Sequence, residues 1–221
     1  MSSPAASPAA VTAEDVLWYI PNKIGYARVV TAVISFFTMP SCPVTTGLVY
    51  SISCLLDALD GTMARKYNQV SRLGAVLDMV TDRATTAGLL CFLTLAFPAW
   101  AVFFQVLLGL DISSHYMHMY ASLAISGGSH KNVTKESSPL LHMYYSRRDV
   151  LFTVCFFNEA FFGGLYLMAF ADYYTVGKWI AILSFPLWAF KQFANVIQLQ
   201  RAALMLATED AKDASEKARQ N

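Results

Sequence analysis

Charged side chains are scarce in this chain, and their scarcity excludes most soluble folds. Only 14% of the 221 residues are Asp, Glu, Lys or Arg, whereas 56% are hydrophobic. Soluble domains carry about 25% charged residues, and a soluble globule could not bury so much apolar side chain. The formal net charge of +1 also lacks the basic excess that is typical of nucleic-acid binding. We therefore expect a membrane protein with several spans and no nucleic-acid partner.

Cysteine motifs and a secretory leader are missing as well. The four cysteines are far apart in the sequence and form no Cys-x-x-Cys or Cys/His cluster. This pattern argues against a zinc site and against a disulfide framework. Residues 1–13 are rich in Ser, Pro and Ala, which predicts a disordered N-terminus. No basic segment precedes an apolar core there, so we expect no cleavable signal peptide.

Six long apolar segments make up most of the remaining chain. A membrane-spanning helix needs about 20 mostly apolar residues. The short aromatic-rich stretch 14–21 precedes them and is typical of an amphipathic helix in the membrane interface. We predict an all-α integral membrane fold, with this N-terminal amphipathic juxtamembrane helix followed by six transmembrane helices. The predicted spans are residues 24–39, 43–67, 73–97, 100–125, 150–171 and 176–207.

Lysine and arginine are distributed unevenly between the two ends of these spans. With an even number of spans, both termini share one side, which also receives the basic turn 65–72 and the connector 126–148. The loops on the opposite side contain one basic residue, Lys178. Because basic loops stay on the cytoplasmic side, we expect a membrane domain over residues 14–207 and a polar cytoplasmic tail over residues 208–221.

Four aspartates lie near the predicted cytoplasmic ends of the second and third spans. Asp57 and Asp60 are three residues apart, and Asp78 and Asp82 are four apart, so each pair lies on one helix face. The short turn between the two spans can bring these faces together. Ionised groups near lipid cost roughly 2.5–3.5 kcal/mol each on insertion scales, so a cluster of four indicates a function.

The chemistry of this cluster favours divalent metal ions. Converging carboxylates repel one another unless cations neutralise them, and hard oxygen ligands suit Mg²⁺ or Mn²⁺ rather than zinc. Four carboxylates are sufficient for a two-metal site with ions about 3.5–4 Å apart, as used in displacements at phosphorus. Gly61 would let a phosphate or nucleotide approach the helix, and Arg65 offers a planar group suited to phosphate oxygens. Gly74 would let the two helices pack closely.

The same stretch resembles the signature of a known family. Residues 57–82 read Asp-x-x-Asp-Gly-x-x-Ala-Arg, then eight residues, then Gly-x-x-x-Asp-x-x-x-Asp. Every fixed position of the signature of the CDP-alcohol phosphatidyltransferase family is present. Residues 21–28 are similar to the usual start of that family's first helix. Residues 111–120 are similar to its eukaryotic branch that uses myo-inositol.

The resemblance implies a fold, an activity and partners. It implies six transmembrane helices after a juxtamembrane helix, a homodimer, and an endoplasmic reticulum location with the active site facing the cytoplasm. It also implies an enzyme that transfers the phosphatidyl group of CDP-diacylglycerol to myo-inositol and releases CMP. Membrane lipids would surround the protein.

The resemblance further implies roles for individual residues. The four aspartates would hold two divalent ions, Mg²⁺ or Mn²⁺, and Asp82 would also accept a proton as the general base. The contacts to CDP-diacylglycerol would come from Gly61, Arg65 and Ser71.

The acceptor alcohol requires a second set of residues. A polyol needs several converging hydrogen-bonding groups in a half-wet cavity, and the candidates are Asp111, His115, Lys131 and Arg147. The histidine could instead hydrogen-bond between helices, and the two basic residues could instead attract lipid head groups. Lys191, in the sixth span, is a polar residue to which the sequence assigns no role.

Other functions remain open at this point. Acids inside a membrane also mark cation pathways, so a cation transporter is the rival class, although the acids cluster at one end and no repeat links the two halves. A catalytically silent scaffold is disfavoured because the set of acids is complete. Within the enzyme class, the acceptor could be serine, glycerol 3-phosphate or inositol phosphate, so the choice of inositol depends on the resemblance.

Overall fold

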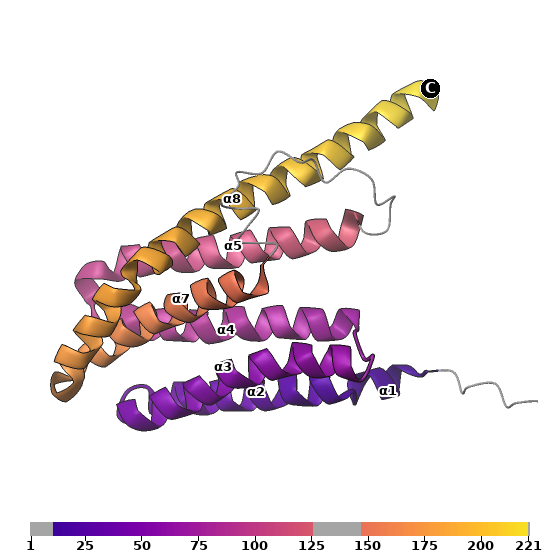
Figure 1. The fold of residues 1–221 in the computed structure, drawn as a ribbon. Helices are drawn as coiled ribbons and strands as arrows, with labels where there is room; N and C mark the ends of the chain where they lie inside the picture. Colours follow the sequence, from indigo (N-terminus) through magenta and orange to yellow (C-terminus); the bar gives the residue numbers. More distant parts are fainter. Residues whose placement is uncertain (1–10, 126–146, 221) are drawn as a thin grey trace, which may run out of the picture. The chain divides into compact units, whose positions relative to one another are not determined.

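The computed structural model describes residues 11–125 and 147–220, and all regular structure in these ranges is helical. The all-α prediction is therefore confirmed for the described part of the chain. Each of the six predicted apolar segments coincides with one long helix (Figure 1). The elements are α1 Ala13–Leu17, α2 Ile20–Thr38, α3 Pro43–Lys66, α4 Arg72–Ala96, η1 Pro98–Trp100, α5 Ala101–Ile125, α7 Arg148–Met168, η2 Ala171–Tyr173 and α8 Tyr174–Gln220.

The chain divides into two compact units, Met1–Thr85 and Thr86–Asn221. In the first unit, α2 and α3 pack against each other along their length. Pro43 occupies the first turn of α3, where the missing N–H of proline leaves no hydrogen bond unmade. The first unit therefore contains an antiparallel helix pair, to which the N-terminal part of α4 is joined by a short turn.

The turn between α3 and α4 determines how the aspartate-bearing helix ends are connected. Asn68 adopts a left-handed conformation with φ of 53°, which Asn tolerates better than most residues. Gln69 N donates to Ala64 O at 2.8 Å and closes the end of α3. The side-chain oxygen of Gln69 also accepts from Ile20 N at 2.9 Å, so the start of α2 is held beside the same turn.

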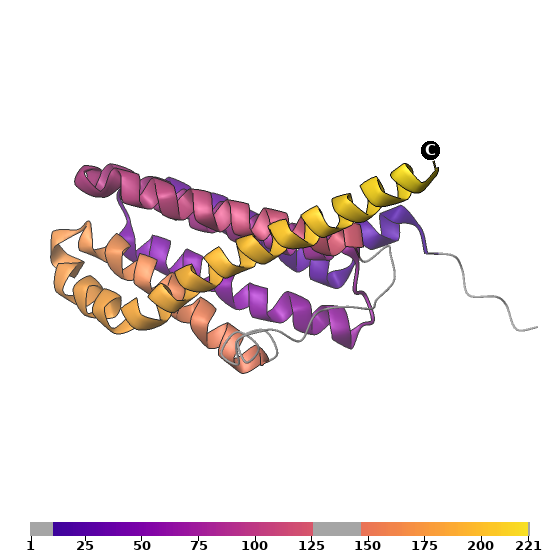
Figure 2. The ribbon, with the colours of Figure 1, turned by 90° about the horizontal axis from the view of Figure 1, so that it is seen from above.

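The second unit is built mainly from α5, α7 and α8, with α8 packing against both other helices (Figure 2). A Cβ at Gly164 would lie 2.8 Å from Gly177 O and 2.8 Å from Ala181 N. The backbones of α7 and α8 therefore touch, as small residues allow in membrane helices. Further along, Phe161 stacks on Trp188 with ring centroids 4.3 Å apart.

Helix α8 extends beyond its predicted span. It contains 47 residues, so it is about 70 Å long at 1.5 Å per residue, whereas the hydrocarbon core of a bilayer is about 30 Å thick. Its last part is charged and exposed, with Lys212 Nζ bonded to Glu209 Oε1 at 2.6 Å one turn away. The tail 208–220 is therefore a solvated extension of α8.

Apolar side chains on the surface indicate a membrane protein. Phe37, Leu95 and Val102 have exposed fractions of 83%, 79% and 71%, which would be costly in water. Among the described residues, two segments are long and apolar enough to cross a membrane, Asp149–Met168 and Ala171–Gln220. Polar residues interrupt the other long helices, among them the aspartates of α3 and α4.

Candidate metal and substrate site

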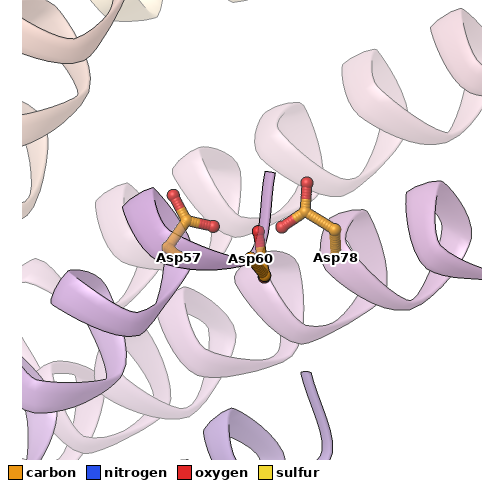
Figure 3. A group of neighbouring side chains, drawn as sticks. All are labelled: Asp57, Asp60 and Asp78. Carbon is orange, nitrogen blue, oxygen red and sulfur yellow. The ribbon is translucent and has the colours of Figure 1, made fainter. Parts of the chain in front are cut away.

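The four aspartates converge within the first unit. Asp57 and Asp60 project from α3 and meet Asp78 and Asp82 from the N-terminal half of α4. One carboxylate oxygen from each of Asp57, Asp60 and Asp78 lies within 4.8 Å of the others, and Figure 3 shows these three side chains on neighbouring helices. The predicted convergence of the two helix faces is confirmed.

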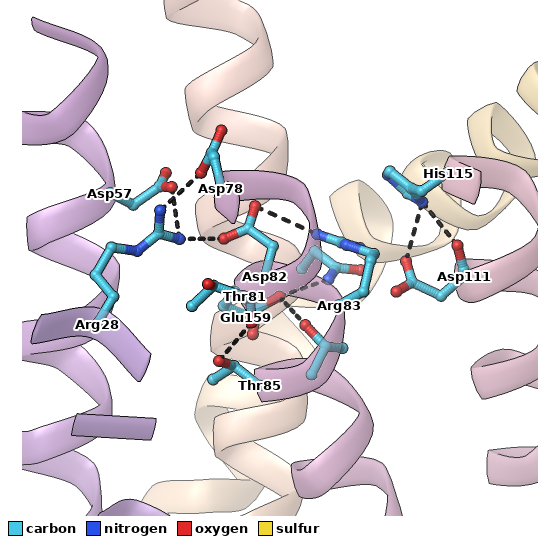
Figure 4. Close-up of polar contacts among 12 residues, drawn as sticks. Arg28, Asp57, Asp78, Thr81, Asp82, Arg83, Thr85, Asp111, His115 and Glu159 are labelled. Carbon is cyan, nitrogen blue, oxygen red and sulfur yellow. Dashed lines mark hydrogen bonds and ion pairs between the residues drawn. The ribbon is translucent and has the colours of Figure 1, made fainter. Parts of the chain in front are cut away.

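Arg28 of α2 completes this cluster, and sequence reasoning missed it as a site residue. Its Nη2 lies 2.7 Å from Asp57 Oδ1, and its Nη1 lies 2.8 Å from Asp60 Oδ2 and 2.7 Å from Asp78 Oδ1. Nη2 also pairs with Asp82 Oδ1 (Figure 4). A signal was present, because Arg28 is the one charged residue in the apolar stretch 24–39, and a charge in such a place needs a partner.

The charges in this cluster do not balance. Arg83 also approaches the site, with Nη2 3.6 Å from Asp82 Oδ2. Four carboxylates therefore face two guanidinium groups, and the site has a formal excess of negative charge when the acids are ionised. Half-exposed carboxylates such as Asp57 and Asp78, with exposed fractions of 43% and 47%, are accessible to a further cation.

These residues fit divalent ions. Their oxygens already surround one cationic group, the guanidinium of Arg28, which acts here as a stand-in for a metal ion. Carboxylate oxygens are hard ligands of the kind that Mg²⁺ and Mn²⁺ prefer. The excess of negative charge is also of the sign that a divalent cation would offset. The arrangement can therefore hold such ions on α3 and α4.

A cleft of about 190 Å³ opens beside the acids within the first unit. The three residues predicted to contact the donor, Gly61, Arg65 and Ser71, all line it together with Asp60 and Asp78. The structure thus brings the predicted donor residues next to the predicted metal ligands. Because Gly61 has no side chain, the wall of the cleft is open at that point.

Asn22 is a second residue of the site that sequence reasoning missed. Its side chain is 1% exposed, and its amide donates to Val16 O at 2.6 Å. Its other polar atom, Oδ1, is buried in the wall of the cleft and has no hydrogen-bond partner among the described residues. A buried acceptor that lacks a hydrogen bond costs free energy.

Gly74 has a different role from the predicted one. We expected it to let the two aspartate-bearing helices pack closely. A Cβ at this position would instead lie 2.9 Å from Asn22 Oδ1 and 3.1 Å from Ser71 Oγ. Gly74 therefore makes room for Asn22 of α2 in the wall of the cleft.

The described candidates for acceptor binding belong to the second unit. Asp111 and His115 lie on α5 in the second unit, with His115 Nδ1 3.6 Å from Asp111 Oδ1. His115 Nε2 is 3.5 Å from the buried Lys191 of α8. Arg147 is exposed and pairs with Asp149 at 2.5 Å. Lys131 lies outside the described residues.

Comparison with known proteins identifies relatives that extend over nearly the whole chain. The family model described as CDP-alcohol phosphatidyltransferase matches residues 18–178. The CDP-diacylglycerol–inositol 3-phosphatidyltransferase of Saccharomyces cerevisiae is 66% identical over 212 residues, which cover 96% of each chain. The human protein with that name is 42% identical, with 92% of this chain and 98% of the human chain covered. The Candida albicans protein is 50% identical. No solved structure matches the chain.

Proposed function

This chain belongs to the CDP-alcohol phosphatidyltransferase family, and we propose that it transfers the phosphatidyl group of CDP-diacylglycerol to myo-inositol. The products are phosphatidylinositol and CMP. Full-length similarity to relatives with this named activity, in yeasts and in human, supports the assignment. The enzyme is thus a phosphotransferase of phospholipid biosynthesis.

The observation that carries the mechanism is the convergence of Asp57, Asp60 and Asp78 beside the cleft, with Asp82 joined to them through Arg28. We assign Asp57, Asp60, Asp78 and Asp82 as ligands of two divalent ions, Mg²⁺ or Mn²⁺. When bound there, the ions would neutralise the charge that develops on the diphosphate as CMP leaves. Placing the ligands on two helices joined by a short turn fixes their separation.

The cleft is assigned to the CDP-diacylglycerol head group. Arg65 lines it and presents a guanidinium that can donate two parallel hydrogen bonds to phosphate oxygens. Gly61 and Ser71 contribute an open wall and a hydroxyl beside the acids.

Asp82 is assigned as the general base. It accepts the proton of one inositol hydroxyl at Oδ2, whose contact to Arg83 Nη2 is comparatively long, at 3.6 Å. The hydroxyl oxygen forms a bond to the β-phosphorus, and the bond from that phosphorus to the bridging oxygen breaks, so that CMP leaves. This direct displacement needs no covalent enzyme intermediate.

The proposal also includes the acceptor site and the topology. Asp111, His115, Lys131 and Arg147 are assigned to inositol binding because a polyol needs several converging hydrogen-bonding groups. We propose six transmembrane spans in the endoplasmic reticulum, a cytoplasm-facing active site and a homodimer. Helix α1 would lie at the interface, where the exposed Trp18 suits the head-group region.

One experiment tests this function. Purified protein in nanodiscs is incubated with CDP-diacylglycerol, Mn²⁺ and one labelled alcohol at a time: myo-inositol, serine, glycerol 3-phosphate or inositol phosphate. We expect stoichiometric CMP release and a labelled lipid with inositol alone. Formation of a different lipid would reassign the acceptor, and Mn²⁺ flux into vesicles without CMP release would support a cation transporter instead.

A further inference from the structure

Arg28 has an unusual position for a residue of a metal site. Its side chain is 3% exposed, and its two terminal nitrogens contact all four aspartates. Its remaining nitrogen, Nε, is buried without a hydrogen-bond partner among the described residues. Among the described residues, the guanidinium is therefore bound by the aspartates alone, and its Nε–H makes no hydrogen bond.

The atoms that Arg28 contacts are the atoms a metal would need. Asp57 Oδ1, Asp60 Oδ2 and Asp78 Oδ1 each lie 2.7–2.8 Å from a guanidinium nitrogen. Mg²⁺ requires its oxygen ligands at about 2.0–2.1 Å in near-octahedral geometry. A metal ion bound to these oxygens would compete with the guanidinium for the same negative charge. The two cations therefore disfavour each other at this position.

The charge distribution explains why a cation is kept there. Without one, four carboxylates on two adjacent helices would repel one another and push α3 and α4 apart. Arg28 comes from a third helix, α2, so its ion pairs also tie that helix to the acids. The half-exposed Asp57 and Asp78 leave a route by which a divalent ion can reach the acids.

We propose that Arg28 is a resident counter-cation, which holds the four aspartates together in the metal-free enzyme and is displaced when a divalent ion binds. This proposal rests on the metal assignment of the proposed function. It makes Arg28 a positioning residue that weakens metal affinity and stabilises the metal-free protein. The enzyme thus keeps a formed site whether or not the ion is present.

The test measures metal binding and stability without substrate. Full-length wild type, Arg28→Gln and Arg28→Lys are purified in nanodiscs, with Lys23→Gln as the matched control. Lys23 is an exposed positive charge on the same helix, and it lies over the ring of Trp18 rather than against the acids. Mn²⁺ affinity is obtained from the electron paramagnetic resonance signal of free Mn²⁺, and Tm is recorded in EDTA and in saturating Mn²⁺.

If the metal displaces Arg28, removing the arginine should raise the Mn²⁺ affinity and lower the Tm measured in EDTA. Arg28→Gln should bind Mn²⁺ at least about tenfold more tightly, because the competing charge is gone, while its Tm in EDTA falls. The Mn²⁺ affinity and Tm of Arg28→Lys should lie between those of Arg28→Gln and wild type. A lysine ammonium keeps the positive charge but is too compact to span four carboxylates. The Mn²⁺ affinity of Lys23→Gln should match that of wild type within about twofold, because solvent ions screen exposed charges.

Two results would overturn the proposal, and they are distinguishable. Equal or weaker Mn²⁺ binding by Arg28→Gln would show that the arginine supports the metal instead of competing with it. If Arg28→Gln does not fold, equal or weaker Mn²⁺ binding by Arg28→Lys would overturn the proposal in the same way. Absence of saturable Mn²⁺ binding by wild type would overturn the metal assignment as well.

Discussion

Gly74→Ala is expected to damage the donor cleft, although alanine is the better helix former. The added Cβ would lie 2.9 Å from Asn22 Oδ1 and 3.1 Å from Ser71 Oγ. Asn22 is buried and tied to Val16 O at 2.6 Å, so it cannot retreat without losing that hydrogen bond. Ser71 Oγ accepts from Gly74 N at 3.0 Å and is held in the same way.

The change in the free energy of unfolding of Gly74→Ala is the sum of two opposed effects. Alanine in place of glycine within a helix normally stabilises by about 0.5–1 kcal/mol, whereas overpacking costs about 1–3 kcal/mol. The steric term is larger, so we expect a net loss of about 1 kcal/mol in the free energy of unfolding. Because both displaced side chains line the cleft, KM for CDP-diacylglycerol should rise about fivefold. A fivefold change corresponds to about 1 kcal/mol, the same size as the expected loss of stability.

The matched control is Gly47→Ala in α3. A Cβ there would meet nothing within 4 Å, so this variant should keep its KM and have an equal or slightly higher Tm. Tm is measured by thermal unfolding in nanodiscs, and KM by CMP release. If Gly74→Ala and Gly47→Ala behaved alike in both assays, the argument that Gly74 makes room for Asn22 would be wrong.

Three further predictions concern the base, the donor and the helix packing. Asp82→Asn should abolish turnover while leaving CDP-diacylglycerol binding by calorimetry largely intact, and retained turnover would contradict its role as the base. Arg65→Lys should raise KM for CDP-diacylglycerol about tenfold, because the planar fork is lost, and an unchanged KM would remove Arg65 from the donor site. Gly177→Ala should lower the free energy of unfolding by about 1–3 kcal/mol, because its Cβ would lie 2.5 Å from Gly164 O. Gly109→Ala, which has open space, is its control, and equal Tm values would argue against close packing of α7 and α8.

The helices and the acid cluster were predictable from the sequence because both depend on local spacing. Pro43 and Pro98 interrupt the apolar runs and mark helix boundaries: α3 begins at Pro43, and α4 ends at Ala96, just before Pro98. Same-face spacing and a short turn were sufficient to bring the aspartates together. The charged tail after residue 207 was predicted as a polar segment, and it continues α8.

The partners of those acids could not be predicted in the same way. Arg28 is 29 residues or more from every aspartate that it contacts, and spacing along one helix says nothing about such distances. Asn22 reaches the cleft because Gly74 lacks a side chain, which depends on how α2 lies beside α4. Lys191 approaches His115 across 76 residues for the same kind of reason. Long-range packing decided these contacts.

The most direct test of the account is the number of Mn²⁺ ions that each chain binds. We expect about two tightly bound ions per chain in wild type and in Asp172→Asn, a surface control outside the site. Asp78→Asn should lose tight binding, because Asp78 is one of the three acids whose oxygens converge. The same stoichiometry and affinity in all three proteins would contradict the assignment of the aspartates as the metal site.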